Sequence, residues 1–257
     1  MELTKLSRKT YLIIRYILFE KYAFVFFFFF KIVIDPIKFK LKVLVKNPFI
    51  KNRTIYINIE KLNNFLIKKK TIKILEIGTH LGEFSFKLND YLLKKKIKLK
   101  IISVDPYSDD FRFVNKNYIY KIFRHNLSLK NRSKNIKHLR LKSLDAFKFF
   151  KKKKYKFDLI FIDGSHLYKD VKTDLKFSID YRKNYKTEVF LDDLDYTYEE
   201  LLKIYKNKKI LNNLLNKSLK INYVKDKVNF HPGITLSVKE LNLKFSKERY
   251  GSLRKVI

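Results

Sequence analysis

Two short apolar strings, each ending at a glycine beside polar side chains, constrain this chain more than any other feature. Residues 74–82 read ILEIGTHLG, and residues 158–166 read DLIFIDGSH. Each apolar run has the length of a buried strand, and each breaks at a glycine. In an open parallel sheet, ligands bind beyond the carboxyl ends of the strands. The two strings therefore predict one cleft, which would contain Glu76, Gly78, Gly82, Asp163 and His166.

The rest of the chain alternates short apolar runs with helical patterns, as in a doubly wound α/β sheet. Strands are expected at about 72–77, 99–104, 137–141, 157–162 and 187–191, and helices at about 82–94, 113–123, 144–151, 167–180 and 197–215. Residues 55–69 have the spacing of an amphipathic helix. Residues 219–224 and 233–238 read as two further strands, joined by a loop that contains His231, for which we expect a structural role.

Residues 11–34 form the most apolar stretch, YLIIRYILFEKYAFVFFFFFKIVI, which four charged residues interrupt. The longest uncharged run, Tyr22 to Phe30, falls short of the roughly 20 residues that a spanning helix needs. Two interpretations stay open: a segment that lies in a membrane interface, or a helix that covers an apolar face of the domain or of a second subunit. Asp35-Pro36 and Asn47-Pro48 bracket a basic connector that we expect to be irregular.

The net charge of +34 attracts polyanions, so nucleic acid must be considered as a partner. Lys and Arg are spread along the whole chain, however, and a nucleic-acid surface would gather them on one face with interleaved aromatic residues. Nucleic acid is therefore the less favoured partner, and an anionic membrane surface fits the charge as well. The absence of cysteine excludes disulfides, thiolate metal sites and a cysteine nucleophile.

Polar residues at the predicted strand ends are candidates for binding a nucleoside. The loop with Gly78, Thr79 and Gly82 has the spacing GxxxG, which speaks against the GxGxxG loop of dinucleotide sites. Asp105 closes the second strand, where an acid suits the hydroxyls of a ribose; the alternative is a turn aspartate before a proline. Ser143 and Asp145 follow the third strand as weaker candidates, and Ser143 alternatively caps a helix.

These residues resemble the class I S-adenosylmethionine-dependent methyltransferases. The string DGSHLYKDVKTDL at residues 163–175, with the later pair Asp192-Asp193, is similar to the family that includes the macrocin and mycinamicin sugar O-methyltransferases. The resemblance covers roughly residues 55–240. It implies that three aspartates hold a divalent metal, usually magnesium, and that His166 removes the proton of the substrate hydroxyl. The implied metal ligands are Asp163, Asp192 and Asp193, and the implied cofactor contacts are Glu76, Gly78, Thr79, Gly82, Asp105, Ser143, Asp145 and Asp163.

The chemistry agrees with that assignment, because an aliphatic hydroxyl must approach an alkoxide before it accepts a methyl group. A hard, oxygen-ligated Mg²⁺ can lower the pKa of a bound hydroxyl, and a histidine with a pKa of about 6.5 can accept its proton. The alternatives are a solvated acid pair for Asp192-Asp193 and a helix-start residue for His166. The sequence also departs from the family, because bulky His80 stands in a loop that is usually rich in small residues.

We therefore expect a Rossmann-like, seven-stranded sheet, mostly parallel with an antiparallel last strand, in residues 51–240. An apolar extension at 1–50 would precede it, and a basic tail at 241–257 would follow. The expected enzyme methylates a hydroxyl of a sugar or glycoconjugate, in the cytoplasm or at the inner face of a membrane where bacterial surface polysaccharides are assembled. A homo-oligomer is compatible with this. The alternatives are an RNA-binding protein or RNA methyltransferase, and a membrane-attached scaffold with an inactive cleft.

Overall fold

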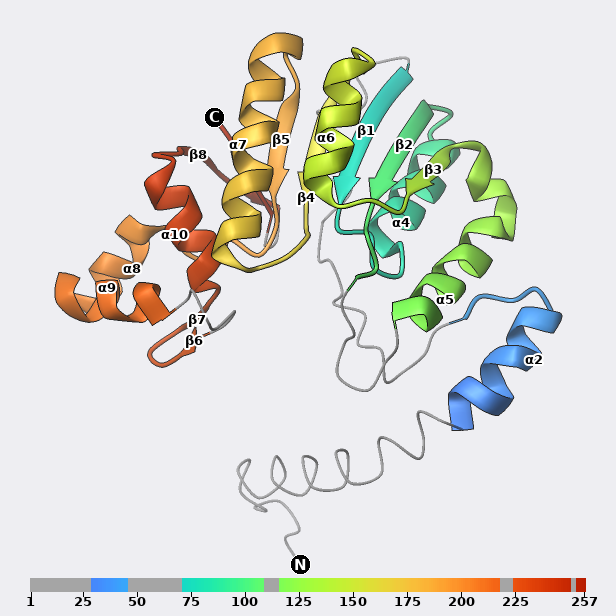
Figure 1. Ribbon diagram of the computed structural model, residues 1–257, viewed down its shortest axis with the longest axis horizontal. Coiled ribbons are helices and arrows are strands. Elements are labelled where there is room, and N and C mark those ends of the chain that lie inside the picture. The colour runs from blue at the N-terminus through green and yellow to red at the C-terminus, as the bar shows by residue number, and fades with distance from the viewer. Residues whose placement is uncertain (1–28, 46–70, 109–115, 218–223, 251–252) are drawn as a thin grey trace, which may run out of the picture.

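The computed structural model describes residues 29–45, 71–108, 116–217, 224–250 and 253–257. Its main sheet has seven strands in the order β3-β2-β1-β4-β5-β9-β8 (Figure 1). Strands β1 to β5 pair in parallel, and β9 is antiparallel to both of its neighbours. The strands are β1 (Thr71–Ile77), β2 (Lys98–Val104), β3 (Ile136–Leu139), β4 (Leu159–Ile162), β5 (Glu188–Leu191), β8 (Phe245–Tyr250) and β9 (Leu253–Val256). The predicted fold class is confirmed.

Helices cover both faces of the sheet, so the central strands are buried on both sides, as parallel strands usually are. In β1, Ile74 packs with α4 (Glu83–Lys94) and α5 (Lys116–Ser128), while Leu75 packs with α6 (Ser143–Lys152) and α7 (Tyr168–Tyr185). Helices α8 (Tyr198–Tyr205) and α9 (Lys208–Lys217) form a separate cluster around Phe230 of β7 (Asn229–Phe230), which pairs with β6 (Val224–Lys225). The short helix η2 (Leu129–Lys134) follows α5.

The secondary structure predicted for the last part of the domain was wrong. Residues 233–238 lie in a helix, α10 (Pro232–Glu240), rather than in a strand. Proline suits the first turn of a helix, and the Ser237 hydroxyl donates to the carbonyl oxygens of Gly233 and Tyr168. Packing of α10 against α7 thus outweighs the strand preference of its β-branched residues. The segment 241–257, expected as a basic tail, contains β8 and β9 of the main sheet.

Other differences concern where helices begin and end. The helical stretch predicted at 197–215 is divided where Lys206 adopts a left-handed backbone and the Asn207 side chain accepts hydrogen bonds from the first turn of α9. The connector expected to be irregular begins with a helix, α2 (Asp35–Lys40), which continues η1 (Phe30–Ile34) at the end of the apolar segment. The helix predicted at 55–69 and most of the apolar segment 11–34 lie outside the described residues.

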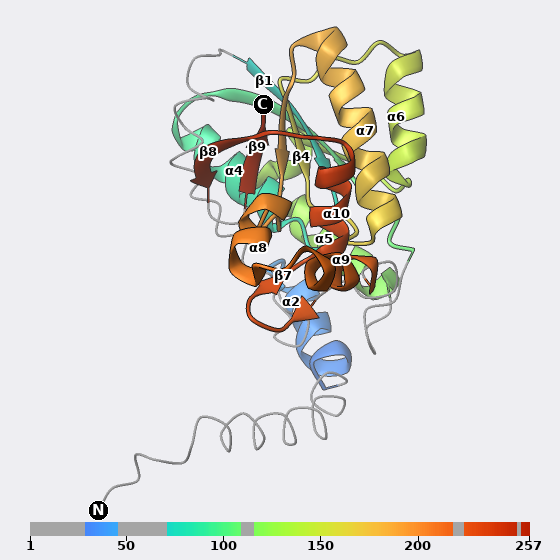
Figure 2. The same ribbon diagram turned by 90° about the vertical axis from the view of Figure 1, so that its left-hand side faces the viewer.

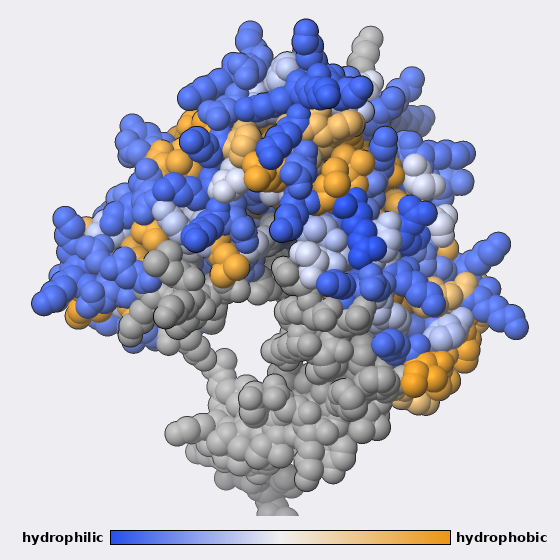
Figure 3. All heavy atoms as spheres, in the orientation of Figure 1, coloured by the Kyte–Doolittle hydropathy of each residue, from blue (hydrophilic) through white to orange (hydrophobic). Residues whose placement is uncertain are grey.

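The α2 segment is fastened to α5 by buried polar contacts. The Tyr118 hydroxyl donates to the buried carboxylate of Asp35, and the Asn126 side chain bonds to both backbone groups of Val45. Figures 1 and 2 place α2 on the side of the sheet toward which β1 and β2 point. An apolar patch surrounds it (Figure 3), made of Phe29, Ile32, Val33, Ile37, Leu41, Val43 and Leu44. None of the helices in the described ranges is long and apolar enough to cross a membrane.

Candidate active site

Backbone hydrogen bonds gather the loops that follow β1, β4 and β5 at one edge of the sheet. The amide of Asp163 donates to the carbonyl oxygen of Ile77 at 2.8 Å, and the amide of Asp192 donates to that of Ile162 at 2.9 Å. Gly78 has a φ of +86°, and a Cβ atom there would lie 1.8 Å from the carbonyl oxygen of Asp163. The loops after β1 and β4 therefore touch backbone to backbone, which only glycine allows at residue 78.

Asp105 organises the loop after β1. Its Oδ2 accepts the amides of Thr79 and His80 at 3.0 and 2.9 Å, and its Oδ1 accepts the amide of Tyr107 at 2.8 Å. The Tyr107 hydroxyl donates to the carbonyl oxygen of His80, which has a left-handed backbone. These bonds explain how the loop accommodates a bulky histidine between its two glycines. The carboxylate predicted to bind a ribose is thus the group that shapes the loop.

Glu76 is buried at the end of β1 and accepts a hydrogen bond from the Ser85 hydroxyl in the first turn of α4. Burial raises the pKa of its carboxyl to about 8, so the group is largely neutral at pH 7. The neighbouring Thr79 is also buried, and its Oγ1 has no hydrogen-bond partner within the part of the chain that the structure describes. A buried hydroxyl without a partner is costly unless a ligand satisfies it.

The two weaker candidates lie at the start of α6 and differ in their surroundings. Ser143 hydrogen-bonds to Asp174 of α7, whose pKa is raised to about 7 because it is buried. Asp145 is exposed, and its carboxylate lies 3.9 Å from the ammonium group of Lys148. Ser143 therefore joins α6 to α7, while Asp145 faces solvent.

Two histidine–aspartate pairs meet beside the loops after β4 and β5. The Nε2 of His166 lies 2.9 Å from Oδ2 of Asp193, and the Nδ1 of His231 lies 2.9 Å from Oδ2 of Asp195. The imidazole rings cross edge to face, with centroids 4.5 Å apart. One ligand atom from each of His166, Asp193 and His231 lies within 4.8 Å of the other two.

This grouping differs from the metal site that the resemblance implied. Asp192 is buried, and its Oδ1 accepts the backbone amide of Asp193 at 2.8 Å. Within the described residues, the three clustered metal-ligand side chains are Asp193 and two histidines, not Asp163, Asp192 and Asp193. Sequence reasoning gave His231 a structural role, because no local pattern links the start of α10 to the loop after β4.

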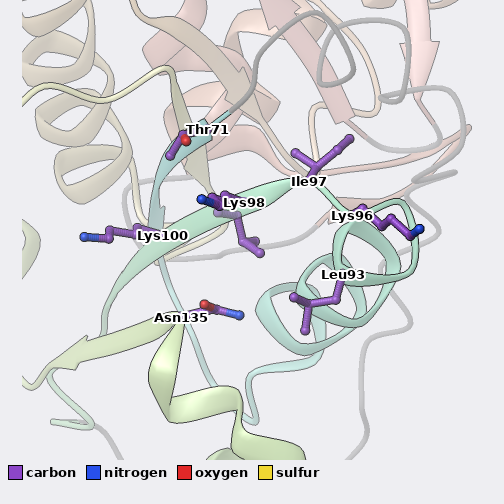
Figure 4. A pocket seen from close by; sticks show the side chains of 8 residues that line it. Thr71, Leu93, Lys96, Ile97, Lys98, Lys100 and Asn135 are labelled. Carbon is purple, nitrogen blue, oxygen red and sulfur yellow. The ribbon is translucent and has the colours of Figure 1, made fainter.

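A hollow elsewhere on the molecule lies away from these residues. Figure 4 shows it at the starts of β1 and β2, lined by Thr71, Lys98, Lys100 and neighbours from the end of α4. Ligands of open α/β sheets bind at the carboxyl ends of the strands, which is the opposite edge. We therefore place the candidate site at the loops after β1, β2, β4 and β5.

Residues 75–194 match a family model described as a methyltransferase domain. The matched range begins within β1, ends after β5 and includes every site residue predicted from the sequence, from Glu76 to Asp193. His231 lies beyond it. No curated protein matches the chain. The family match confirms the predicted enzyme class.

Three similar solved structures are methyltransferases. CalS11, a TDP-rhamnose 3'-O-methyltransferase of calicheamicin biosynthesis, is 14% identical, with 81% of each chain covered and a TM-score of 0.45. PaMTH1 of Podospora anserina, with SAH bound, is 14% identical over 77% of this chain and 74% of that chain, with a TM-score of 0.48. MycE of the mycinamycin pathway, in complex with Mg, SAH and mycinamycin VI, is 13% identical over 80% of this chain and 50% of that chain, with a TM-score of 0.40.

Proposed function

Because the chain carries a methyltransferase domain over residues 75–194, we propose that it transfers a methyl group from S-adenosylmethionine to a hydroxyl of a sugar or glycoconjugate. The observation that carries the proposal is the contact of His166 with Asp193 at the edge where Gly78 touches Asp163. A proton acceptor and a cofactor loop thereby lie on the same side of one sheet.

The loop after β1 has the features that a nucleoside cofactor requires. The loop leads into the start of α4 at Glu83, where the first backbone amides of a helix have no partner within the helix. The unpartnered hydroxyl of Thr79 is a hydrogen-bond donor for a carboxylate, and Oδ1 of Asp105, which accepts one amide, keeps acceptor capacity for a ribose hydroxyl. When bound, S-adenosylmethionine supplies a methyl group on a positively charged sulfur.

His166 is the proposed proton acceptor. With the proton on Nε2 directed to Asp193, the Nδ1 atom is unprotonated and basic. It receives the proton of the acceptor hydroxyl while the new C–O bond forms and the C–S bond of the cofactor breaks. The carboxylate of Asp193 holds the ring in place and stabilises the imidazolium that results. The proton then passes to solvent.

The proposal takes no step through magnesium, because the candidate metal-ligand group found among the described residues combines Asp193 with two imidazoles. Mg²⁺ prefers an octahedral set of oxygen ligands, whereas Asp193 is grouped with two imidazoles. Oδ1 of Asp192 accepts the backbone amide of Asp193. We therefore assign the deprotonation to His166 alone.

The surroundings of α2 support an acceptor presented at a membrane. The apolar patch defined above is accompanied by Lys31, Lys38, Lys40 and Lys42, and α2 lies on the carboxyl-end side of the sheet (Figure 1). Apolar side chains with cationic neighbours are typical of segments that rest on anionic lipid. A lipid-linked glycan held at that surface would lie on the same side as the site.

The test measures transfer of a tritiated methyl group from S-adenosylmethionine by the full chain. Nucleotide sugars, extracted glycolipids and total RNA are offered in separate reactions. We expect label in a sugar-containing fraction, and we expect His166→Asn to reduce it by about 10²- to 10⁴-fold. His125→Asn, on α5 and away from the loops of the site, is the matched control. Label in RNA alone, or full activity of His166→Asn, would contradict the proposal.

A further inference from the structure

We propose that His166, Asp193 and His231 form a binding site for a first-row transition ion such as Zn²⁺. The three side chains come from three separate parts of the fold: the loop after β4, the loop after β5 and the residue before α10. The site shares His166 with the proposed function, but its existence does not depend on methyl transfer.

The spacing of the three ligand atoms suits an ion of this size. Zn²⁺ binds imidazole nitrogen and carboxylate oxygen at about 2.0–2.2 Å, which separates the ligands of a tetrahedral site by about 3.3–3.6 Å. The three atoms here lie within 4.8 Å of one another, and Nε2 of His166 is 2.9 Å from Oδ2 of Asp193. Small side-chain rotations would therefore complete the site.

A second carboxylate holds His231 in the orientation that a ligand needs. Oδ2 of Asp195 lies 2.9 Å from Nδ1 of His231, which leaves Nε2 as the ligand atom. The backbone at Asp195 is held in turn, because its carbonyl oxygen accepts a hydrogen bond from the Arg254 guanidinium at 3.1 Å. Metal-binding histidines commonly donate their other ring nitrogen to such a carboxylate.

The backbone around the two histidines is closely packed. A Cβ atom at Gly233 would lie 2.3 Å from the carbonyl oxygen of His166, so the start of α10 rests directly on the loop after β4. Only 12% of the His166 side chain, 20% of the Asp193 side chain and 9% of the His231 side chain are exposed. Three polar ligands are thus already gathered in a place with little solvent.

The ligand types decide which ions fit. Imidazole suits Zn²⁺, Co²⁺, Ni²⁺ and Cu²⁺, and the hard ion Mg²⁺ prefers oxygen. Two histidines and one carboxylate also leave a coordination position open, as in catalytic rather than structural zinc sites. An ion on Nε2 of His166 would keep the proton on Nδ1, so ion binding and proton acceptance by His166 exclude each other, and a bound ion would block methyl transfer through His166. The two proposals are therefore tested by separate measurements.

The experiment titrates the chelator-treated full chain with Zn²⁺ by calorimetry, and with Co²⁺ while its visible absorption is recorded. We expect one ion per chain and a Co²⁺ spectrum typical of low coordination number. His231→Asn should abolish the spectrum, and Asp195→Asn should weaken binding about 10- to 100-fold, as loss of a carboxylate behind a metal-binding histidine does. His125→Asn should leave both unchanged, and excess Mg²⁺ should not displace the ion.

Unchanged binding in His231→Asn, displacement by Mg²⁺, or no binding at all would overturn this inference. Circular dichroism checks that each variant is folded. If His231→Asn does not fold, the effect of Asp195→Asn on Zn²⁺ affinity decides the test. A chain that binds no ion but transfers methyl groups through His166 would refute the metal site and leave the proposed function standing. A chain that binds Zn²⁺ but not S-adenosylmethionine would refute the proposed function and leave the metal site standing.

Discussion

A Cβ atom at Gly78 would lie 1.8 Å from the carbonyl oxygen of Asp163. The loop after β1 and the loop that leads to His166 are therefore in van der Waals contact through their backbones. This contact ties the position of the proposed proton acceptor to that of the proposed cofactor loop. A change at residue 78 should consequently affect stability and binding together.

We expect Gly78→Ala to destabilise the domain and to weaken binding of S-adenosylhomocysteine. The left-handed backbone costs about 1–2 kcal/mol for a residue with a Cβ atom, and the clash with backbone atoms adds about 1–3 kcal/mol. Thermal denaturation with and without the ligand measures both effects. Gly164→Ala is the control, because a Cβ atom there would make only ordinary contacts at 3.5 Å and beyond. Equal melting temperatures for the two variants would contradict the backbone contact.

The burial of Glu76 should make the stability of the domain depend on pH. Its folded-state pKa of about 8 lies above the ordinary value of 4.5, so the folded state holds a proton that the unfolded state releases. The free energy of unfolding should therefore fall as the pH rises from about 5 to about 8, by about 1 kcal/mol per pH unit from this group. Urea unfolding across that range, compared with Glu76→Gln, isolates the contribution. The glutamine variant should show a flatter profile, and parallel profiles would mean that Glu76 is ionised in the folded protein.

Most of the sheet could be predicted from the sequence, because a parallel strand that is buried on both faces reads as a short apolar run. Strand β1 was expected at 72–77 and spans Thr71–Ile77. Helix α10 could not be predicted in this way, since Ile234, Thr235 and Val238 favour a strand and their helix depends on packing against α7. The same limit applies to the site. Asp105 and Gly78 directly follow strands that could be predicted. His231 contacts His166 because it precedes α10, the helix that the sequence analysis took for a strand.

Asp105 should control cofactor affinity through the shape of the loop. Its carboxylate accepts three backbone amides, those of Thr79, His80 and Tyr107. Asp105→Asn replaces a charged acceptor with an amide, which loses about 1–2 kcal/mol of hydrogen bonding and should weaken binding of S-adenosylhomocysteine about tenfold or more. Calorimetry measures the affinity, with Glu199→Gln on the exposed side of α8 as the control. Unaltered affinity in Asp105→Asn would show that neither the loop nor a ribose hydroxyl depends on this carboxylate.

The apolar patch around α2 should bring the protein to anionic membranes. Ile37 and Leu41 are 51% and 66% exposed, so replacing both with glutamate removes apolar surface and adds negative charge without disturbing the core. We expect the full chain to sediment with vesicles of phosphatidylcholine and phosphatidylserine, and we expect the double variant Ile37→Glu, Leu41→Glu to bind them markedly less, because both the apolar and the electrostatic contributions are reduced. Ile210→Glu on α9, 49% exposed and remote from α2, is the matched control. If all three proteins sediment equally and salt alone releases them from the vesicles, the attraction is due to the overall positive charge and not to this patch.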